Sequence, residues 1–149
     1  MIDYTLKAIS ADELSFKITP MKGNPEGKFA IHPFFSRRIR QANENPAIHI
    51  VMLECKIEGT EKEPTPYRIL ARFIGVFEVK NIETDEDRRI FALNATETMF
   101  PYLRAALASL TADALVMPLQ LPAVSGATLF PEDRGVGGYT LSVDPKVVN

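Results

Sequence analysis

The chain has 149 residues, a length typical of one domain that buries a core of its own. Its 17 basic and 19 acidic residues give a net charge of −2, which is too balanced to indicate a nucleic-acid-binding protein from bulk charge. The one cysteine, Cys55, excludes an intrachain disulfide and is typical of a reducing compartment.

The N-terminus alternates charged and apolar residues rather than forming a secretory signal, and no apolar run approaches the roughly 20 residues that span a bilayer. We therefore expect a cytoplasmic protein without membrane insertion. We expect one domain over 1–149, with its core at about 4–130 and a tail at 131–149.

The first part of the chain predicts extended structure. Apolar and polar residues alternate over 4–9 and again over 14–19, which predicts two short strands. Pro and Gly clusters over 20–27 predict a loop. A further strand is expected over 29–40, where Pro33 belongs at an edge or a bulge because it has no N–H to donate.

The clearest strand runs over 48–58, and a partner strand follows over 67–79 to form a hairpin. One face of the first strand carries Val51, Leu53, Cys55 and Ile57. Its opposite face begins with Ile48, Ile50 and Met52 before it becomes charged, and the partner strand is also partly apolar on both faces. A sheet covered on one side needs only one apolar face, so we expect a second burial surface, either an oligomer interface or a ligand groove.

Helical patterns follow the strands. Thr84 and the acids at 85–87 predict an N-cap and a first helical turn. A second helix is predicted from Pro101, which is tolerated at the first helical position, to about Ala114. A short extended segment is expected over 117–122. Strands followed by helices predict an α+β fold.

The sequence shows no pattern that we can assign to catalysis or metal binding. His32 and His49 lack metal-site spacing and are interpreted as surface or packing residues of strands. Ser125 lacks the nucleophile-elbow pattern, the acids at 85–87 are explained by capping, and the glycines of 135–138 predict a flexible tail rather than a phosphate loop. We expect no enzymatic activity, no metal and no cofactor.

Three arginines, Arg37, Arg38 and Arg40, form the main basic cluster, and we interpret it as a solvated strand edge. The nearby aromatic residues precede the arginines instead of interleaving with them, which does not favour nucleic-acid binding.

Apolar surface is the remaining functional signal. Aromatic residues and methionine suit an adaptable groove for apolar segments, although any one of them also suits the core or a subunit interface. The candidate groove residues are Phe34, Phe35, Ile48, Ile50, Met52, Phe73, Phe77 and Met99.

One stretch has a recognisable pattern: it begins Phe100-Pro101-Tyr102-Leu103-Arg104, continues through Ala108-Ser109-Leu110 and Pro118-Leu119-Gln120-Leu121-Pro122-Ala123-Val124, and ends Ala127-Thr128-Leu129-Phe130. It resembles the signature of the SecB protein-export chaperones. The region 9–16 and the hairpin over 46–79, with Gly75-Val76-Phe77 near its end, are similar to the corresponding parts of that family. The resemblance covers roughly residues 4–130.

The resemblance implies a four-stranded antiparallel sheet with two helices packed on one side, assembled as a dimer of dimers. It implies a holdase that works without ATP and binds unfolded precursor proteins in long apolar grooves between sheet and helix. It also implies docking of the translocase motor SecA on an acidic sheet surface and the C-terminal tail, for which Asp12 and Glu13 are the possible residues here.

The chain departs from the family's pattern in charge. Lys17, Arg37, Arg38 and Arg40 stand where acids are usual, Arg72 lies on the inner hairpin, and 135–149 lacks the expected amphipathic helix and acidic tail. These changes bear on SecA docking, and a second hypothesis is a SecB-like chaperone that serves a different client, such as an antitoxin. Arginines beside the groove would favour acidic clients.

Two further hypotheses use the same strands without a chaperone function. A ligand-binding domain or small-molecule enzyme predicts a convergent set of titratable residues in the groove. A purely structural oligomer predicts that subunit contacts cover the apolar faces of the strands completely. The apolar area left open in the assembled oligomer distinguishes the structural role from the chaperone.

Overall fold

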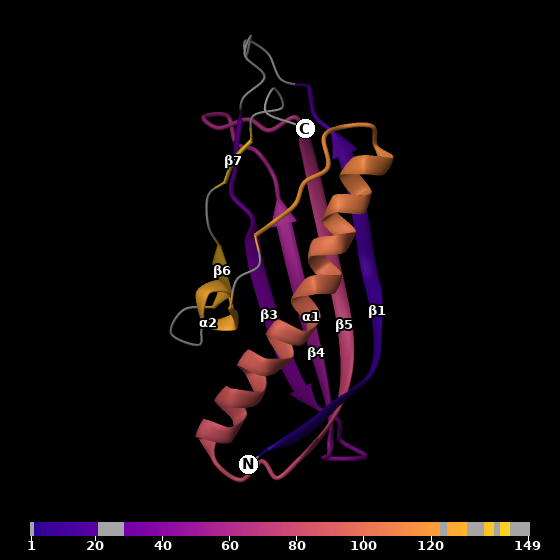
Figure 1. The fold of residues 1–149 in the computed structure, drawn as a ribbon, viewed down its shortest axis with the longest axis vertical. Helices are drawn as coiled ribbons and strands as arrows, with labels where there is room; N and C mark the ends of the chain where they lie inside the picture. The colour runs from indigo at the N-terminus through magenta and orange to yellow at the C-terminus, as the bar shows by residue number, and fades with distance from the viewer. Residues whose placement is uncertain (1, 21–28, 123–124, 131–135, 139–140, 144–149) are drawn as a thin grey trace.

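The computed structural model describes residues 2–20, 29–122, 125–130, 136–138 and 141–143. Five strands form one antiparallel sheet in the order β1-β5-β4-β3-β6. Their bounds are β1 Asp3–Ile18, β3 Phe34–Gln41, β4 Ile48–Ile57, β5 Tyr67–Lys80 and β6 Val136–Gly138. The long helix α1 (Asp85–Asp113) crosses one face of the sheet, as Figure 1 shows. The predicted α+β fold with an antiparallel sheet is confirmed, and the sheet has five strands rather than four.

Two short strands and a short helix complete the fold. β2 (Phe29–Ile31) and β7 (Leu141–Val143) pair with each other in a separate two-stranded sheet. The four-residue helix α2 (Gly126–Leu129) contacts α1 and β6. The expected loop over 20–27 lies, apart from Pro20, outside the described residues, as does most of the tail.

The chain over 29–40 and the glycine-rich stretch after it differ from expectation. The predicted single strand is divided around Pro33 into β2 and β3, because proline cannot donate to a ladder at that point. The segment 136–138 is β6, which pairs with Phe34, Phe35 and Ser36 of β3, and so this described part is a strand instead of a flexible tail. That strand supplies the fifth member of the sheet.

β1 is one strand where the sequence predicts two. Its pairing with β5 shifts between Leu6 and Ala8 and again between Ala11 and Glu13, so each shift inserts one extra residue into β1. Each insertion changes the parity of the residues that face α1. The β1 residues that pair with helix-facing positions of β5 are Tyr4, Leu6, Ile9, Ala11, Leu14, Phe16 and Ile18. A search for strict alternation therefore stops at each bulge although the strand continues.

α1 is a single 29-residue helix that runs through Pro101. The predicted N-cap is confirmed, since Thr84 and Asp87 form a capping box. The predicted helix start at Pro101 is wrong. A buried row at four-residue spacing passes the proline without interruption and consists of Phe91, Ala95, Met99, Leu103 and Leu107. Burial of each large member contributes about 1.5–3 kcal/mol, which together offsets the cost of about 3 kcal/mol for an interior proline.

The C-terminal end of α1 is held by its own backbone and by the segment that follows. Leu115 adopts a left-handed φ of 62°, and the N–H groups of Leu115 and Val116 donate to the carbonyls of Ala112 and Thr111. The Thr111 hydroxyl then accepts from the N–H of Leu119 at 2.8 Å. The segment over 117–122 forms neither helix nor strand, and its residues Leu119 and Leu121 are 5% and 2% exposed.

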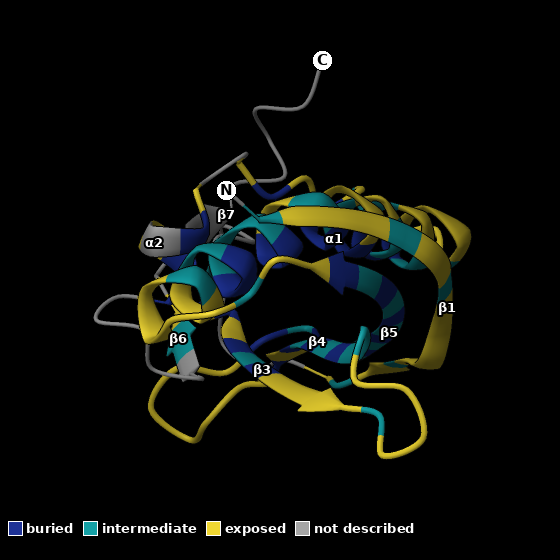
Figure 2. Cartoon of the chain, turned by 90° about the horizontal axis from the view of Figure 1, so that it is seen from below, coloured by how far each residue is buried: buried dark blue, intermediate teal, exposed yellow. Residues whose placement is uncertain are grey.

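The core lies between α1 and the sheet. Buried residues are concentrated on α1, β4 and β5, whereas β1 is mostly exposed or partly exposed, as Figure 2 shows. Gly75 of β5 lies close against α1, since a Cβ there would lie 2.9 Å from the Met99 sulfur of α1. Within the described part of the chain, no helix combines the length and the apolar character needed to cross a membrane.

Candidate functional site

β4 and β5 carry apolar side chains on both faces. On the face toward α1, Val51 and Leu53 of β4 are 0% exposed. On the opposite face, which we call the open face, Ile50 and Met52 of β4 are only partly buried. They pair with Val76 and Ile74 of β5, which extend the apolar strip across the two strands. The expected second apolar surface is therefore present in this chain.

The structure divides the eight candidate groove residues between these two faces. Phe35, Phe77 and Met99 are 0% exposed and Phe73 is 9% exposed, and all four pack in the core between α1 and the sheet. The Phe77 ring lies 5.5 Å from the ring of Phe91 on α1, centroid to centroid. A client has no access to these side chains while α1 stays on the sheet. We therefore keep the groove proposal only for the candidates on the open face.

The open-face candidates are Ile48, Ile50, Met52 and Phe34. The first three follow one another at every second position of β4 and are partly exposed. Phe34 is 50% exposed and pairs with Lys56, four residues along β3 from Arg38. At about 3.3 Å per residue, Phe34 lies roughly 13 Å along the strand from that arginine. Phe34 is therefore separate from the cluster formed by Ile50 and Met52.

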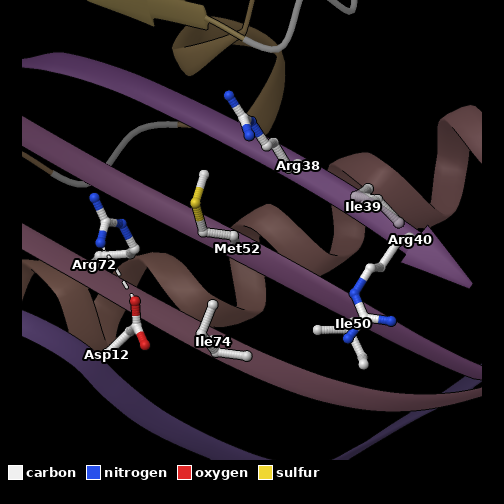
Figure 3. A pocket seen from close by; sticks show the side chains of 8 residues that line it. All are labelled: Asp12, Arg38, Ile39, Arg40, Ile50, Met52, Arg72 and Ile74. Carbon is white, nitrogen blue, oxygen red and sulfur yellow. Dashed lines mark hydrogen bonds and ion pairs between the residues drawn. The ribbon is translucent and has the colours of Figure 1, made fainter. Parts of the chain in front are cut away.

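A groove of about 740 Å³ opens on this face, over the strands β3, β4 and β5. Figure 3 shows its apolar floor, formed by Ile50 and Met52 of β4 with Ile74 of β5. Charged side chains from β1, β3 and β5 stand around that floor. The described residues that line it are Asp12, Arg38, Ile39, Arg40, Ile50, Met52, Arg72 and Ile74.

The three arginines of the groove differ in their partners. Arg72 donates to Glu54 at 2.9 Å and to Asp12 at 3.3 Å, and Glu13 lies 3.5 Å away. The hydrogen bond to the Glu54 carboxylate raises the pKa of Arg72, whose charge is thereby held and compensated. Arg38 and Arg40 are exposed, and neither makes a hydrogen bond or ion pair with another described residue. No described residue compensates the positive charge that they place at the β3 side of the groove.

Arg37 does not belong with these arginines, although it is next to them in sequence. It is 9% exposed and lies on the helix-facing side of β3, opposite Leu53. Its Nη1 donates to the Thr96 hydroxyl at 3.0 Å and its guanidinium carbon lies 4.6 Å from the Phe130 ring centroid. The predicted cluster of three arginines is thus one buried residue that joins β3 to α1 and two residues on the open face.

Asp12 and Glu13, the possible partner-docking residues, are both exposed on β1. Asp12 is the extra residue of the second β1 bulge, and both carboxylates reach Arg72 of β5. Their negative charge is partly compensated within the chain. A docking role for them remains a proposal.

The histidines and the cysteine are placed apart from one another. His32 contacts Glu63 at the surface, and the His49 ring lies 5.2 Å from the Phe91 ring. Burial raises the pKa of the Cys55 thiol, which is 0% exposed in the core. Among the residues that the structure describes, no three His, Cys, Asp or Glu side chains gather into a set able to hold a metal ion.

Comparison with protein families gives a match over most of the chain. The family model described as preprotein translocase subunit SecB matches residues 6–135. The protein-export protein SecB of Neorickettsia sennetsu is 28% identical over 102 residues, which cover 64% of this chain and 62% of that protein. An uncharacterized protein of Methanocaldococcus jannaschii is 28% identical over 103 residues, covering 67% and 65%. The chain thus spans just under two thirds of the length of both relatives.

A solved structure has a similar fold. It is the SecB-like chaperone of Mycobacterium tuberculosis in complex with a peptide from the HigA1 antitoxin, which matches with a TM-score of 0.66 at 15% identity. The match covers 82% of this chain and 91% of that one. At this identity the likeness shows a shared fold.

Proposed function

The chain belongs to the SecB family, and from this premise we propose that it is a non-enzymatic chaperone that holds other polypeptides unfolded without ATP. The observation that carries the proposal is the strip of partly exposed apolar residues on the open face, at Ile50, Met52 and Ile74. A contiguous apolar surface rimmed by charged residues is typical of a surface that binds another polypeptide.

The mechanism follows from the burial of client apolar surface. Each Å² removed from water contributes about 25 cal/mol, from which the cost of ordering the client is subtracted. One groove therefore binds one segment weakly. If several copies assemble, as in the dimer of dimers that we propose, one client contacts several grooves at high effective concentration and gains avidity. Weak, repeated contacts of this kind need no nucleotide and no catalytic group.

The client belongs to one of two classes. Export of precursor proteins by way of SecA in the cytoplasm is one proposal, with Asp12 and Glu13 as the docking residues. The second is a dedicated client such as an antitoxin. The charge of the open face favours the second, because Arg38 and Arg40 have no carboxylate partner among the described residues whereas Asp12 and Glu13 already pair with Arg72. The SecB-like chaperone of similar fold that binds an antitoxin peptide also supports the second proposal.

The test is dilution of a denaturant-unfolded precursor into buffer that contains the purified protein at near-stoichiometric amounts. Light scattering should fall in proportion to the protein added and should be the same with and without ATP. Unchanged aggregation of several unrelated precursors, with the protein itself folded, would contradict a general holdase. Suppression that requires ATP would contradict the mechanism.

A further inference from the structure

We propose that the open-face groove selects acidic client segments, and that Arg38 and Arg40 of β3 are the residues that select them. This inference rests on the proposed function, since it names the class of polypeptide that the same groove holds. The occupant is an extended segment of another protein in which Asp or Glu residues stand beside apolar ones.

The position of the two arginines carries the inference. Arg38 and Arg40 pair with Met52 and Ile50 across the β3–β4 ladder, so each guanidinium borders one residue of the apolar floor (Figure 3). Both lie on the same face of β3, roughly 6.6 Å apart along the strand. An extended segment with acids two residues apart repeats this spacing, and apolar residues further along the same face of that segment then lie toward Ile50, Met52 and Ile74.

Electrostatics distinguishes this pair from the third arginine of the groove. Arg72 is held by three carboxylates of the same chain and offers little free charge to a client. Arg38 and Arg40 meet no carboxylate among the described residues, although both are exposed. Association with an acidic segment supplies the missing counter-charge, and a basic segment meets repulsion at the same two positions.

The apolar floor of the groove favours a polypeptide over other anionic ligands as the occupant. A nucleic-acid strand is held by aromatic side chains on which bases stack, and none of the described residues that line the groove is aromatic. A small inorganic anion gains nothing from Ile50, Met52 and Ile74. An acidic segment with apolar residues uses both features of the groove at once.

The experiment measures binding of two labelled peptides to the full chain by fluorescence anisotropy. The acidic peptide carries two Glu and then two Leu at alternate positions, so that one face of the extended peptide presents both residue types, and the basic peptide carries Lys in place of every Glu. The test variant is R38E/R40E, and the matched control is K62E/R88E, which makes the same charge change at two exposed positions outside the groove. Each exposed ion pair is expected to change affinity by roughly two- to fivefold, so reversing two should cost about tenfold or more.

We expect wild type to bind the acidic peptide more tightly than the basic one, R38E/R40E to reverse this order, and K62E/R88E to leave it unchanged. The preference should shrink as salt rises. Equal affinity of wild type for both peptides, or an unchanged preference in R38E/R40E, would overturn the inference. A change in sedimentation of R38E/R40E from the wild-type oligomeric state would also overturn it, because a second copy of the chain would then cover the face.

Aggregation suppression of a neutral precursor separates this inference from the function on which it rests. If wild type and R38E/R40E both suppress aggregation but show no peptide preference, the charge selection is wrong and the holdase proposal stands. If wild type neither suppresses aggregation nor binds either peptide, the holdase proposal itself fails.

Discussion

Gly75 of β5 and Met99 of α1 are in such close contact that a Cβ on the glycine would lie 2.9 Å from the methionine sulfur. The ring of Phe77 is the next neighbour, at 3.1 Å. This contact sets how closely α1 lies on the sheet, and hence whether the core residues beneath it stay closed to a client.

Replacing Gly75 should therefore loosen the helix. We expect G75V to lower the free energy of unfolding by about 1–3 kcal/mol, because the added carbons overpack against Met99 and Phe77. G75A should cost less, since the methionine side chain is flexible. Urea denaturation measures both. In the double variant G75V/M99A the two costs should be less than additive, and strict additivity would contradict the contact.

Leu115 should be a site where a single change stabilises the protein. It holds a φ of 62° at the end of α1 and is 93% exposed. A left-handed backbone costs a non-glycine residue about 1–2 kcal/mol, and glycine loses about 0.5–1 kcal/mol more entropy on folding. We expect L115G to raise the free energy of unfolding by up to about 1 kcal/mol, measured by thermal or urea denaturation. A114G, at a residue with ordinary φ of −80°, should show no gain; a similar gain in both variants would argue against relief of strain.

Arg37 and Arg38 should respond differently to the same substitution. R37M removes a hydrogen bond from a buried guanidinium to Thr96 and should lower stability by about 1–3 kcal/mol. R38M changes an exposed side chain and should stay within about 0.5 kcal/mol of wild type. If urea denaturation shows a larger loss of stability for R38M than for R37M, the assignment of Arg37 to the core is contradicted.

Asp87 should make the start of α1 sensitive to acid. Its carboxylate accepts from the N–H groups of Glu83 and Thr84 at 3.0 and 3.1 Å, which lowers its pKa below the usual value of 3.8. A carboxyl whose pKa is lower in the folded state stabilises the fold above the unfolded-state pKa. That contribution is lost as pH falls through the folded-state pKa.

D87N tests this dependence, because asparagine keeps an acceptor oxygen and removes the charge. We expect D87N to be less stable than wild type at neutral pH and equal to it at pH values below the native pKa. Urea unfolding at a series of pH values measures the difference. Two stability curves that stay parallel down to the lowest pH would show that the charge contributes nothing.

The sequence predicted the central hairpin well and the edges of the sheet less well. Alternation over 48–58 and 67–79 identified both faces of β4 and β5, because burial on each face repeats every second residue. The two bulges of β1 interrupt this alternation, since each extra residue moves the following side chains to the opposite face. Local preference favours a helix start at Pro101, because it cannot show that the row from Phe91 to Leu107 is buried on both sides of the proline.

The candidate site was predicted only in part for a similar reason. The sequence shows that Met52 and Met99 are both apolar, but only packing shows that Met99 lies in the core and Met52 at the surface. Ile74 and Arg72 were not among the candidates, although pairing Ile74 with Met52 across the hairpin would have pointed to both. Strand alternation also distinguishes Arg37 from Arg38 once Phe35 is known to face the core.

The central claim is that the open-face strip holds unfolded clients, and the most direct measurement is aggregation suppression by I50T/M52T/I74T. Threonine keeps strand propensity while it removes apolar area. The matched control is L14T/I18T, which changes two exposed apolar residues of β1 outside the groove. With both variants shown to be folded by circular dichroism, the account predicts that the triple variant needs roughly tenfold more protein for equal suppression and that the control equals wild type. Full suppression by the triple variant would contradict the account.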